Sequence, residues 1–333
     1  MGKSSVRFSP ELSKVKSISK PLKKPDFTKP ILFIFGPTGV GKTELLLDLD
    51  PQRFSVINAD SIQVYRYLDI GSAKADQTVQ AAIQHYLIDI QDPWQQFSVG
   101  DFIEQADQAC QEIWSAGKVP VVCGGTAYYF KHFLFGLSEA PPSDELIRDH
   151  IASQIEQNGR AWAYEYLKRV DPVSFARIHS SDIYRISRAL EVWETCGRPL
   201  SSFSIPSEKR NGMQPLIIGL QREAEVLRER LGLRIKTMFD EGLEEEIRSL
   251  IRMGAQASWP GLQGIGYREF FQAREHGEWS RSLIADQIER NSRFYAKRQL
   301  TFFRSFAEAV WKDPSDKEDI HALIEAYLKT FSG

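Results

Sequence analysis

The feature that most constrains the fold of this chain is a glycine-rich segment directly after a short apolar run. The apolar run, Ile-Leu-Phe-Ile-Phe at residues 31–35, is followed by Gly-Pro-Thr-Gly-Val-Gly-Lys-Thr. This segment fits the pattern G-x-x-x-x-G-K-[ST] in the strand–loop–helix context that the pattern requires. Glycines let backbone N–H groups close around phosphate oxygens, and the start of the next helix favours negative charge. The predicted phosphate-binding residues are Gly36, Pro37, Thr38, Gly39, Val40, Gly41, Lys42 and Thr43.

The last two residues of this segment have separate predicted tasks. Lys42 would place a point charge on a phosphate oxygen, and the Thr43 hydroxyl would be a ligand of Mg²⁺. A glycine turn without a ligand is the alternative, and the preceding apolar run disfavours it. The segment therefore predicts binding of a di- or triphosphate, but it does not say what is done with the phosphate.

Short apolar runs alternate with helical stretches up to residue 125. The runs are residues 31–35, 54–57, 86–90 and 119–123. Ser98 followed by Asp101 resembles a capped helix start, and apolar residues then recur at helical spacing until Gly117. This alternation predicts a parallel sheet covered by helices on both faces. Ligands of such sheets lie at the carboxyl ends of strands, where Gly36, Asp60 and Gly124 are expected.

The pattern changes after residue 136. Pro141 and Pro142 interrupt the chain, and helical patterns follow over 144–158, 161–170 and 182–196 before a polar segment at 201–212. Residues 215–220 then predict a further strand, and 223–239, 243–253, 282–304 and 321–330 predict helices. We expect a helical insertion at 140–211 within a core domain formed by 30–139 and 212–333. Residues 1–29 are basic and predict a disordered tail.

Composition excludes several classes of protein. The net charge of −2 means that any nucleic-acid surface must be local. The three cysteines are widely spaced, which argues against a disulfide framework or a zinc site. No apolar run approaches the roughly 18 residues of a membrane helix, and we expect no signal peptide because no apolar h-region is evident. We therefore expect a cytoplasmic protein that does not enter a membrane.

Six short motifs follow the glycine-rich segment, and their order is more specific than that segment alone. They are residues 58–65, 69–74, 124–129, 185–191, 264–268 and 297–299. In this order and at these separations, the set resembles the tRNA dimethylallyltransferases (tRNA isopentenyltransferases) of the bacterial type. The resemblance covers nearly all of the chain from residue 31 onward.

The resemblance implies a fold, an activity and partners. The fold would be an α/β, P-loop NTPase-like parallel sheet flanked by helices, with an inserted all-helical domain. The activity would be transfer of a dimethylallyl group from dimethylallyl diphosphate to the exocyclic amine of the adenine immediately 3′ of the anticodon in tRNA. Mg²⁺ would assist departure of the diphosphate. The partner would be the tRNA anticodon stem-loop, and we expect a monomer.

The resemblance also implies catalytic roles for four residues, Asp60, Thr126, Lys42 and Arg234. The aspartate at Asp60 would be the general base for the amine, although a turn cap or a magnesium ligand are alternatives. Thr126 would lie near the reacting atoms, or else make only a local turn bond. Lys42 and Arg234 would lie against the diphosphate, and Arg230, one helical turn earlier, could share that face or be solvated.

Residues that match tRNA-contacting positions of the family come from both domains. In the helix predicted at 282–304, cations fall near one face with aromatics between them, which suits contact with phosphates and bases; alone, this pattern is a solvated amphipathic helix. The predicted tRNA-binding residues are Asp60, Ser61, Ile62, Gln63, Thr126, Arg148, Tyr184, Arg185, Ile186, Ser187, Arg188, Gln263, Gly264, Ile265, Gly266, Tyr267, Arg268, Lys297, Arg298, Gln299 and Arg304.

Three other functions remain open from the residues alone. A prenyltransferase acting on free AMP or ADP would use the same chemistry, but the helical insertion and basic residues favour a macromolecular acceptor. A small-molecule kinase would hold ATP in the glycine-rich segment, but no arginine-rich lid is evident. A non-catalytic RNA-binding protein is disfavoured because Asp60 and Thr126 are both present.

Overall fold

The centre of the molecule is a six-stranded sheet in which every pair of neighbouring strands is parallel. The computed structural model describes residues 27–331, so most of the predicted basic tail lies outside the described residues. The strand order is β3-β2-β4-β1-β5-β6. The strands are β1 (Leu32–Phe35), β2 (Phe54–Asn58), β3 (His85–Tyr86), β4 (Val119–Gly124), β5 (Leu216–Leu220) and β6 (Val310–Lys312). The predicted parallel α/β sheet is thereby confirmed.

Two strands differ from the prediction. The strand predicted at 86–90 is only His85–Tyr86, because Leu87 and Asp89 have positive φ angles of 64° and 55°, which no strand can contain. Sequence analysis missed β6 altogether. Its three residues, Val-Trp-Lys, are too few to show the alternation or the apolar run of four or more residues that would mark a strand.

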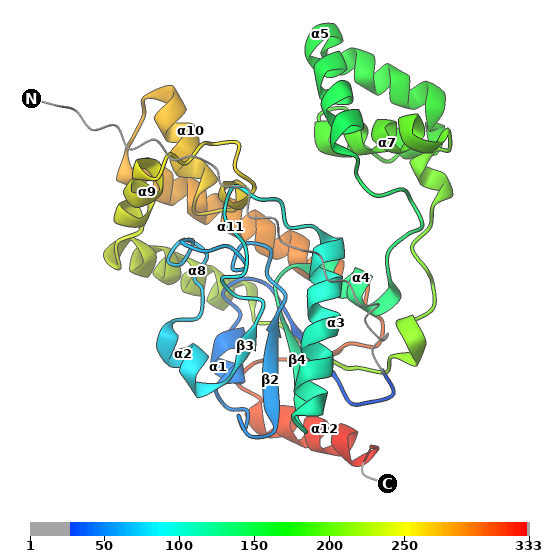
Figure 1. Cartoon of the computed structure of the whole chain (residues 1–333). Helices are drawn as coiled ribbons and strands as arrows, with labels where there is room; N and C mark the ends of the chain where they lie inside the picture. The colour runs from blue at the N-terminus through cyan, green and yellow to red at the C-terminus, as the bar shows by residue number, and fades with distance from the viewer. Residues whose placement is uncertain (1–26, 332–333) are drawn as a thin grey trace, which may run out of the picture.

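Alternate residues of the strands face two separate layers of helices. In β1, Phe33 and Phe35 face the core shared with α3 (Val99–Ser115), α4 (Ala127–Phe135) and α11 (Arg281–Phe303), whereas Leu32 and Ile34 face α1 (Lys42–Leu46) and α12 (Lys317–Lys329). Figure 1 shows α12 below the sheet and α3 along its side. The start of α3 is the predicted one, since Ser98 and Asp101 form a capping box.

Three further helices add side chains to the first of these cores. They are α8 (Ala224–Asp240), α9 (Leu243–Arg252) and α10 (Arg268–His276), whereas α2 (Gln77–Ala82) buries no side chain. Of the short 3-10 turns, η2 (Arg210–Gly212) and η3 (Pro260–Gln263) belong to the sheet domain, and η1 (Leu200–Ser202) packs on the helical unit. Sequence analysis did not predict α4 or α10. Within residues 27–331, no helix combines the length and apolar composition that a membrane span needs.

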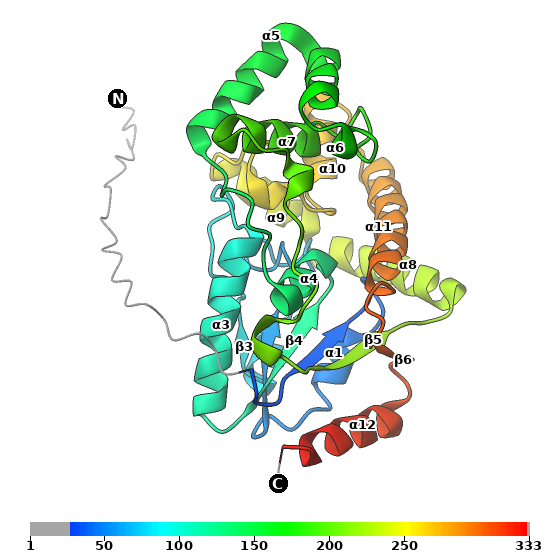
Figure 2. The same ribbon diagram turned by 90° about the vertical axis from the view of Figure 1, so that its right-hand side faces the viewer.

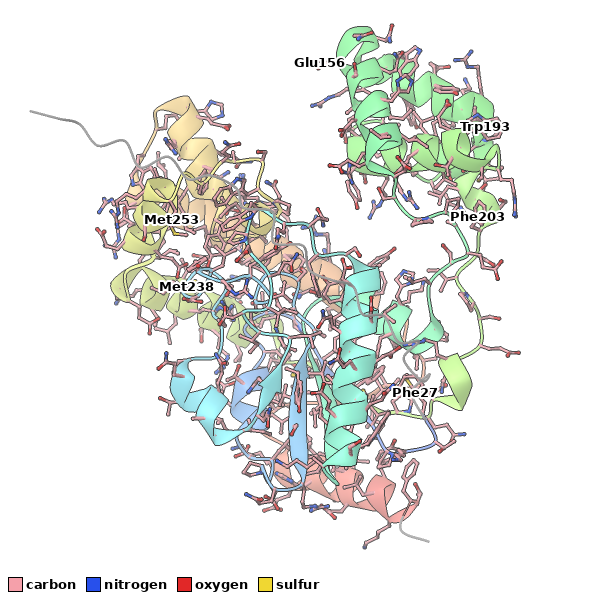
Figure 3. The ribbon with its side chains drawn as sticks, viewed as in Figure 1. Phe27, Glu156, Trp193, Phe203, Met238 and Met253 are labelled. Atoms are coloured by element: carbon pink, nitrogen blue, oxygen red, sulfur yellow. The ribbon has the colours of Figure 1, made fainter. Side chains whose placement is uncertain are left out.

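Residues 145–196 form a helical unit with its own core. It contains α5 (Glu145–Val170), which bends at Gly159, α6 (Pro172–Phe175) and α7 (Ile183–Cys196). Ile151, Leu167 and Leu190 pack inside it. Figures 1 and 2 show this unit joined to the sheet domain by two extended segments. In Figure 3, Glu156 and Trp193 mark the unit and Phe203 marks the returning segment.

The two connecting segments meet where they leave and re-enter the sheet domain. A Cβ on Gly136, at the start of the outgoing segment, would lie 3.5 Å from Cγ of Arg210 in the returning segment. The Arg210 guanidinium lies over the rings of Phe27 and Phe133 and forms an ion pair with Asp107. Figure 3 labels Phe27 beside this turn. The returning segment is therefore fixed to the sheet domain before β5 begins.

Candidate active site

The carboxyl ends of three neighbouring strands bring the predicted catalytic motifs to one edge of the sheet. Phe35 of β1 pairs with Gly124 of β4, and Asn58 of β2 pairs with Cys123 of β4. The residues that follow these strands therefore leave the sheet at the same level. These residues are the glycine-rich segment from Gly36, the Asp60 motif and the Gly125–Thr126 motif.

The glycine-rich segment, residues 36–43, forms a loop that surrounds the side chain of Lys42; we refer to it as the phosphate loop. Gly39 and Gly41 have φ angles of 79° and 116°, values that L-residues with side chains rarely adopt. Nζ of Lys42 donates hydrogen bonds to the carbonyls of Gly36 and Pro37, each at 3.0 Å. Burial lowers the pKa of Lys42 to about 8, while the nearby Cys123 and Asp60 oppose that change. The hydroxyl-bearing Thr43 is exposed at the start of α1.

Two arginines hold the outer side of this phosphate loop. Nε of Arg222 donates to the carbonyl of Val40 at 2.8 Å, and Nε of Arg230 donates to the carbonyl of Gly39 at 2.8 Å. Arg222 is also paired with Asp313, and Arg230 with Glu44. Arg230 is thus held against the loop, with its side chain still 36% exposed. Sequence analysis missed Arg222, although its position just after β5 at the same sheet edge was a usable signal.

Asp60 is both a turn cap and a member of the site. Its Oδ1 accepts hydrogen bonds from the backbone N–H groups of Ile62 at 2.9 Å and Gln63 at 3.3 Å. Its Oδ2 has no hydrogen-bond partner among residues 27–331. The cap that sequence analysis weighed as an alternative therefore exists, and it uses one oxygen while orienting the other.

Thr126 joins the ends of two strands. Its Oγ1 accepts the backbone N–H of Ser61 at 3.0 Å and donates to the Ser61 hydroxyl at 3.3 Å, and its own N–H donates to the carbonyl of Ala59 at 3.1 Å. These bonds are more than a local turn bond, because they cross from β4 to the end of β2. Thr126 and Asp60 are thereby held at one place.

Arg234 reaches the same region from α8. Its Nη2 donates to the carbonyl of Ser72 at 3.3 Å. Burial lowers the pKa of Arg234, while the negative charges of Asp60 and Glu44 act in the opposite direction. Lys42 and Arg234 also influence each other electrostatically. The site thus contains two cations and one carboxylate within mutual electrostatic range.

A carboxylate that sequence analysis missed fixes the loop beneath Arg234. The Glu246 carboxylate accepts the backbone N–H groups of Asp69, Ile70 and Gly71 at 3.1, 2.7 and 3.1 Å. It also accepts the Tyr267 hydroxyl at 2.7 Å, and that hydroxyl accepts the N–H of Ser72 at 3.1 Å. Nothing in the local sequence marks Glu246, which lies in an acidic helical stretch of three glutamates.

Several predicted tRNA-contacting side chains are not at the surface. Ile186 is fully buried in the core of the helical unit, because it lies on the face of α7 that packs on α5. Tyr267 is fully buried, and Gln299 is only 5% exposed. Gly264 and Gly266 are buried as well, with Gly264 packed against Ile62. The side chains of Ile186, Tyr267 and Gln299 therefore make their contacts within the protein, and the assignment of these five residues to tRNA binding stays a prediction.

Other predicted tRNA-contacting residues are partly tied down within the protein. Nε2 of Gln63 donates to the carbonyls of Ser72 and Ala73. Arg268 pairs with the buried Glu269, and Arg188 pairs with Glu191 and donates to the carbonyl of Pro141. Ser61, Ile62, Ser187 and Ile265 are half-buried, and Gln263 is exposed.

The remaining predicted contact residues lie on two exposed faces. In the helical unit, Tyr184 is 83% exposed, and Arg148 and Arg185 are exposed beside acidic partners. Along α11, one face at helical spacing is largely exposed and rich in cations, of which Arg293 pairs with Glu289. This face comprises Arg290, Arg293, Phe294, Lys297, Arg298, Thr301 and Arg304.

The described residues contain no group of three His, Cys, Asp or Glu side chains that could hold a metal ion. Mg²⁺ does not need such a group, because it keeps several waters and binds through one or two protein oxygens and substrate phosphates. The exposed hydroxyl of Thr43 beside the phosphate loop fits this mode of binding.

Two family models match the sequence. The model described as IPP transferase matches residues 63–306, and the model described as isopentenyl transferase matches residues 29–94. The chain is 38% identical over 291 residues to the tRNA dimethylallyltransferase of Borreliella burgdorferi (strain ZS7), covering 87% of this chain and 94% of that protein. It is 41% identical over 297 residues to the tRNA dimethylallyltransferase of Borrelia hermsii, covering 88% and 98%.

Solved structures agree with these matches. The full-length tRNA isopentenylpyrophosphate transferase of Bacillus halodurans has a TM-score of 0.65 at 33% identity, covering 91% of this chain and 98% of that one. A eukaryotic dimethylallyltransferase acting on tRNA has a TM-score of 0.72 at 25% identity, covering 86% and 74%.

Proposed function

The chain belongs to the IPP transferase family, the family of the tRNA dimethylallyltransferases, and on this premise we propose what its site does. The site transfers a dimethylallyl group from dimethylallyl diphosphate to the exocyclic amine of the adenine immediately 3′ of the anticodon in tRNA. One observation carries the proposal: the phosphate loop, Asp60 and Thr126 leave adjacent strands at the same sheet edge. A leaving diphosphate and an acceptor amine need such neighbouring sites.

The phosphate loop binds the diphosphate of the donor. Its N–H groups and Lys42 face the phosphate oxygens, and Lys42 exchanges its bonds with the carbonyls of Gly36 and Pro37 for bonds to the ligand. Arg234 adds a second cation from α8. Fixed donors of this kind stabilise the negative charge that develops as the diphosphate leaves.

Bond making and breaking take place between the amine and the first carbon of the dimethylallyl group. The amine nitrogen forms a bond to this carbon, and the bond between the carbon and the diphosphate oxygen breaks, with the electron pair leaving on the diphosphate. The nitrogen then carries positive charge and loses a proton to Oδ2 of Asp60. Because the amine is a very weak acid, the proton is accepted late, after the nitrogen has begun to gain charge.

Mg²⁺ is the expected cofactor, and the Thr43 hydroxyl would be its protein ligand beside the diphosphate. When bound, it neutralises charge on the departing diphosphate. The chain's own residues orient the donor through the phosphate loop and fix the Asp60 carboxylate through Thr126.

The tRNA is held on the two exposed faces that carry cations and aromatics. The helical unit contributes Arg148, Tyr184 and Arg185, and the exposed face of α11 contributes Lys297, Arg298 and Arg304. The target adenine must leave the anticodon-loop stack to reach Asp60, at a cost of a few kcal/mol. The solved structure of a eukaryotic relative acting on tRNA supports this acceptor class. We place the reaction in the cytoplasm and expect the enzyme to act as a monomer.

The test is to incubate the protein with dimethylallyl diphosphate, Mg²⁺ and unmodified tRNA, followed by mass analysis of the nucleosides. We expect one dimethylallyladenosine per modified tRNA, at the position 3′ of the anticodon. AMP, ADP and ATP are offered in parallel reactions. Prenylation of AMP or ADP without modification of tRNA would overturn the proposal, as would phosphoryl transfer from ATP.

A further inference from the structure

Gln299 lies in a motif that matches tRNA-contacting positions, yet its side chain faces the protein interior. It is only 5% exposed, whereas its neighbours Lys297 and Arg298 are exposed. Its Oε1 accepts the backbone N–H of Thr38 at 3.0 Å, and its Nε2 donates to the carbonyl of Gly125 at 2.7 Å. One carboxamide therefore joins the phosphate loop to the segment that precedes Thr126.

The residues around Gln299 leave room for its contact with Gly125. A Cβ on Gly125 would lie 2.5 Å from Nε2 of Gln299, so a residue with a side chain could not occupy position 125 without displacing the carboxamide. Tyr295, one helical turn before Gln299, lies in the same region. Burial raises the pKa of the Tyr295 phenol to about 12, with Asp60 acting in the same direction and hydrogen bonds to Gln299 and Thr126 opposing the change.

We propose that Gln299 is a positioning residue that sets the distance between the bound diphosphate and the acceptor amine. Thr38 belongs to the loop that binds the diphosphate, and Gly125 precedes the threonine that holds Ser61 next to Asp60. The inference rests on the function proposed above. It also gives α11 two roles: its exposed face carries cations, and its buried face contacts the phosphate loop through Gln299.

The central experiment compares Gln299→Met with Gln287→Met, a substitution of the same kind at a half-buried position of the same helix. Methionine keeps the volume of glutamine and removes both hydrogen bonds. With dimethylallyl diphosphate and anticodon stem-loop RNA saturating, we expect the single-turnover rate of Gln299→Met to fall on the order of 10²-fold, as for a misplacement of about 1 Å. Its affinity for the RNA should stay within about twofold of wild type, and the control should match wild type in both.

Two results would overturn the inference. One is an unchanged rate at saturation in Gln299→Met. The other is a loss of RNA affinity with an intact rate at saturation, which would assign Gln299 to direct RNA contact. A rate loss matched by an equal loss in Gln287→Met would also count against it, because it would reflect a general weakening of α11.

A second variant keeps the test decisive if Gln299→Met folds poorly. Gln299→Glu retains an acceptor for the Thr38 N–H but sets a carboxylate oxygen against the carbonyl of Gly125. We expect its rate to fall as well, while hydrogen exchange of the peptide containing residues 36–43 stays close to wild type. In Gln299→Met the same peptide should exchange faster without any substrate. Equal exchange in wild type and Gln299→Met, or a wild-type rate in Gln299→Glu, contradicts the proposal.

The exchange measurement also distinguishes this inference from the proposed function. If wild-type protein fails to prenylate tRNA, the proposed function is wrong, but the link from Gln299 to the phosphate loop is still tested by the exchange of residues 36–43. If wild-type protein is active and both Gln299 variants match it, only the inference fails.

Discussion

Thr126 accepts a hydrogen bond from the backbone N–H of Ser61 at 3.0 Å, and this bond joins the end of β4 to the end of β2. Since Ser61 follows Asp60, the same bond fixes where the carboxylate lies. Asp60 in turn uses Oδ1 to cap its own turn. The Asp60 carboxylate thus caps a turn with one oxygen and is the proposed general base with the other. A useful test must separate these two roles.

Asp60→Asn makes this separation, because asparagine keeps an oxygen for the turn but loses the charge and basicity. We expect turnover to fall roughly 10²–10⁴-fold, the usual range for a general base, while tRNA and dimethylallyl diphosphate still bind. Single-turnover rates across a Mg²⁺ series provide the measurement. Asp50→Asn is the matched control, since Asp50 caps the turn before β2 in a similar way.

Two other outcomes for Asp60→Asn have distinct signatures. Partial recovery of the rate at high Mg²⁺, together with weaker diphosphate binding, would make Asp60 a metal ligand. A small loss of turnover that follows a lowered melting temperature would limit Asp60 to its structural role as a turn cap. A rate within threefold of wild type removes Asp60 from the mechanism.

Lys42→Ala should weaken binding of dimethylallyl diphosphate and leave tRNA affinity almost unchanged. The pKa of Lys42 is lowered to about 8, so its charge is present below that pH and is lost above it. Donor affinity of the wild type should therefore fall as the pH rises from 7 to 9, and the variant should lack this component. Calorimetric titration with the donor alone measures both effects.

Lys118→Ala is the control for Lys42→Ala, because Lys118 also donates to a backbone carbonyl but lies at the amino end of β4. Equal losses of tRNA and donor binding in Lys42→Ala would argue against separate sites for the two substrates.

Arg185→Ala and Lys297→Ala should each reduce tRNA affinity in a salt-dependent way. For each phosphate that the variant no longer neutralises, the slope of log affinity against log salt should become shallower by about 0.7, the value for single strands. Filter binding between low and physiological salt measures this slope. Arg53→Ala serves as control, since Arg53 pairs with Glu325 of α12, away from both exposed faces. Unchanged slopes in both variants would exclude phosphate binding at these positions.

Glu246→Gln should destabilise the protein by about 1–3 kcal/mol, because an amide NH₂ would replace an acceptor facing backbone N–H groups. The loop at 69–72 should loosen, and Arg234, which donates to Ser72, should lose its support. Urea unfolding and single-turnover rates measure the two effects. Glu245→Gln, on the exposed face of the same helix, should change neither. Full activity in a destabilised Glu246→Gln would limit Glu246 to a structural role.

Local patterns were enough to predict most of the fold. The apolar runs before Gly36 and Asp60 mark buried parallel strands, and Ser98 with Asp101 marks a helix start. Each of these signals lies within a few residues of the element it predicts. β6 could not be predicted, because a half-buried edge strand of three residues has no such signal.

The supporting parts of the site could not be read from local sequence. Each of three supporting side chains contacts a loop that is far away in the chain. Arg222 contacts a residue 182 positions away, Glu246 contacts residues 175–177 positions away, and Gln299 contacts residues 174 and 261 positions away. The predicted assignment of Gln299 and Tyr267 to tRNA contact rests on their neighbours in sequence, which do not show that both side chains are buried. Only the packing of α9, α10 and α11 against the strand ends reveals what these side chains hold.

The position of β5 in the sheet has a consequence for the order of events during synthesis. β1 lies between β4 and β5, and β5 follows the helical unit in the chain. At roughly 5–20 residues per second, one side of β1 therefore waits on the order of ten seconds for its partner after β4 has been made. The contacts within α5 and α7 are local, so we expect the helical unit to be complete first. During synthesis, the nascent chain therefore exposes the unpaired edge of β1 while residues 145–196 are being made. We expect chaperones to be most important for preventing aggregation during this interval.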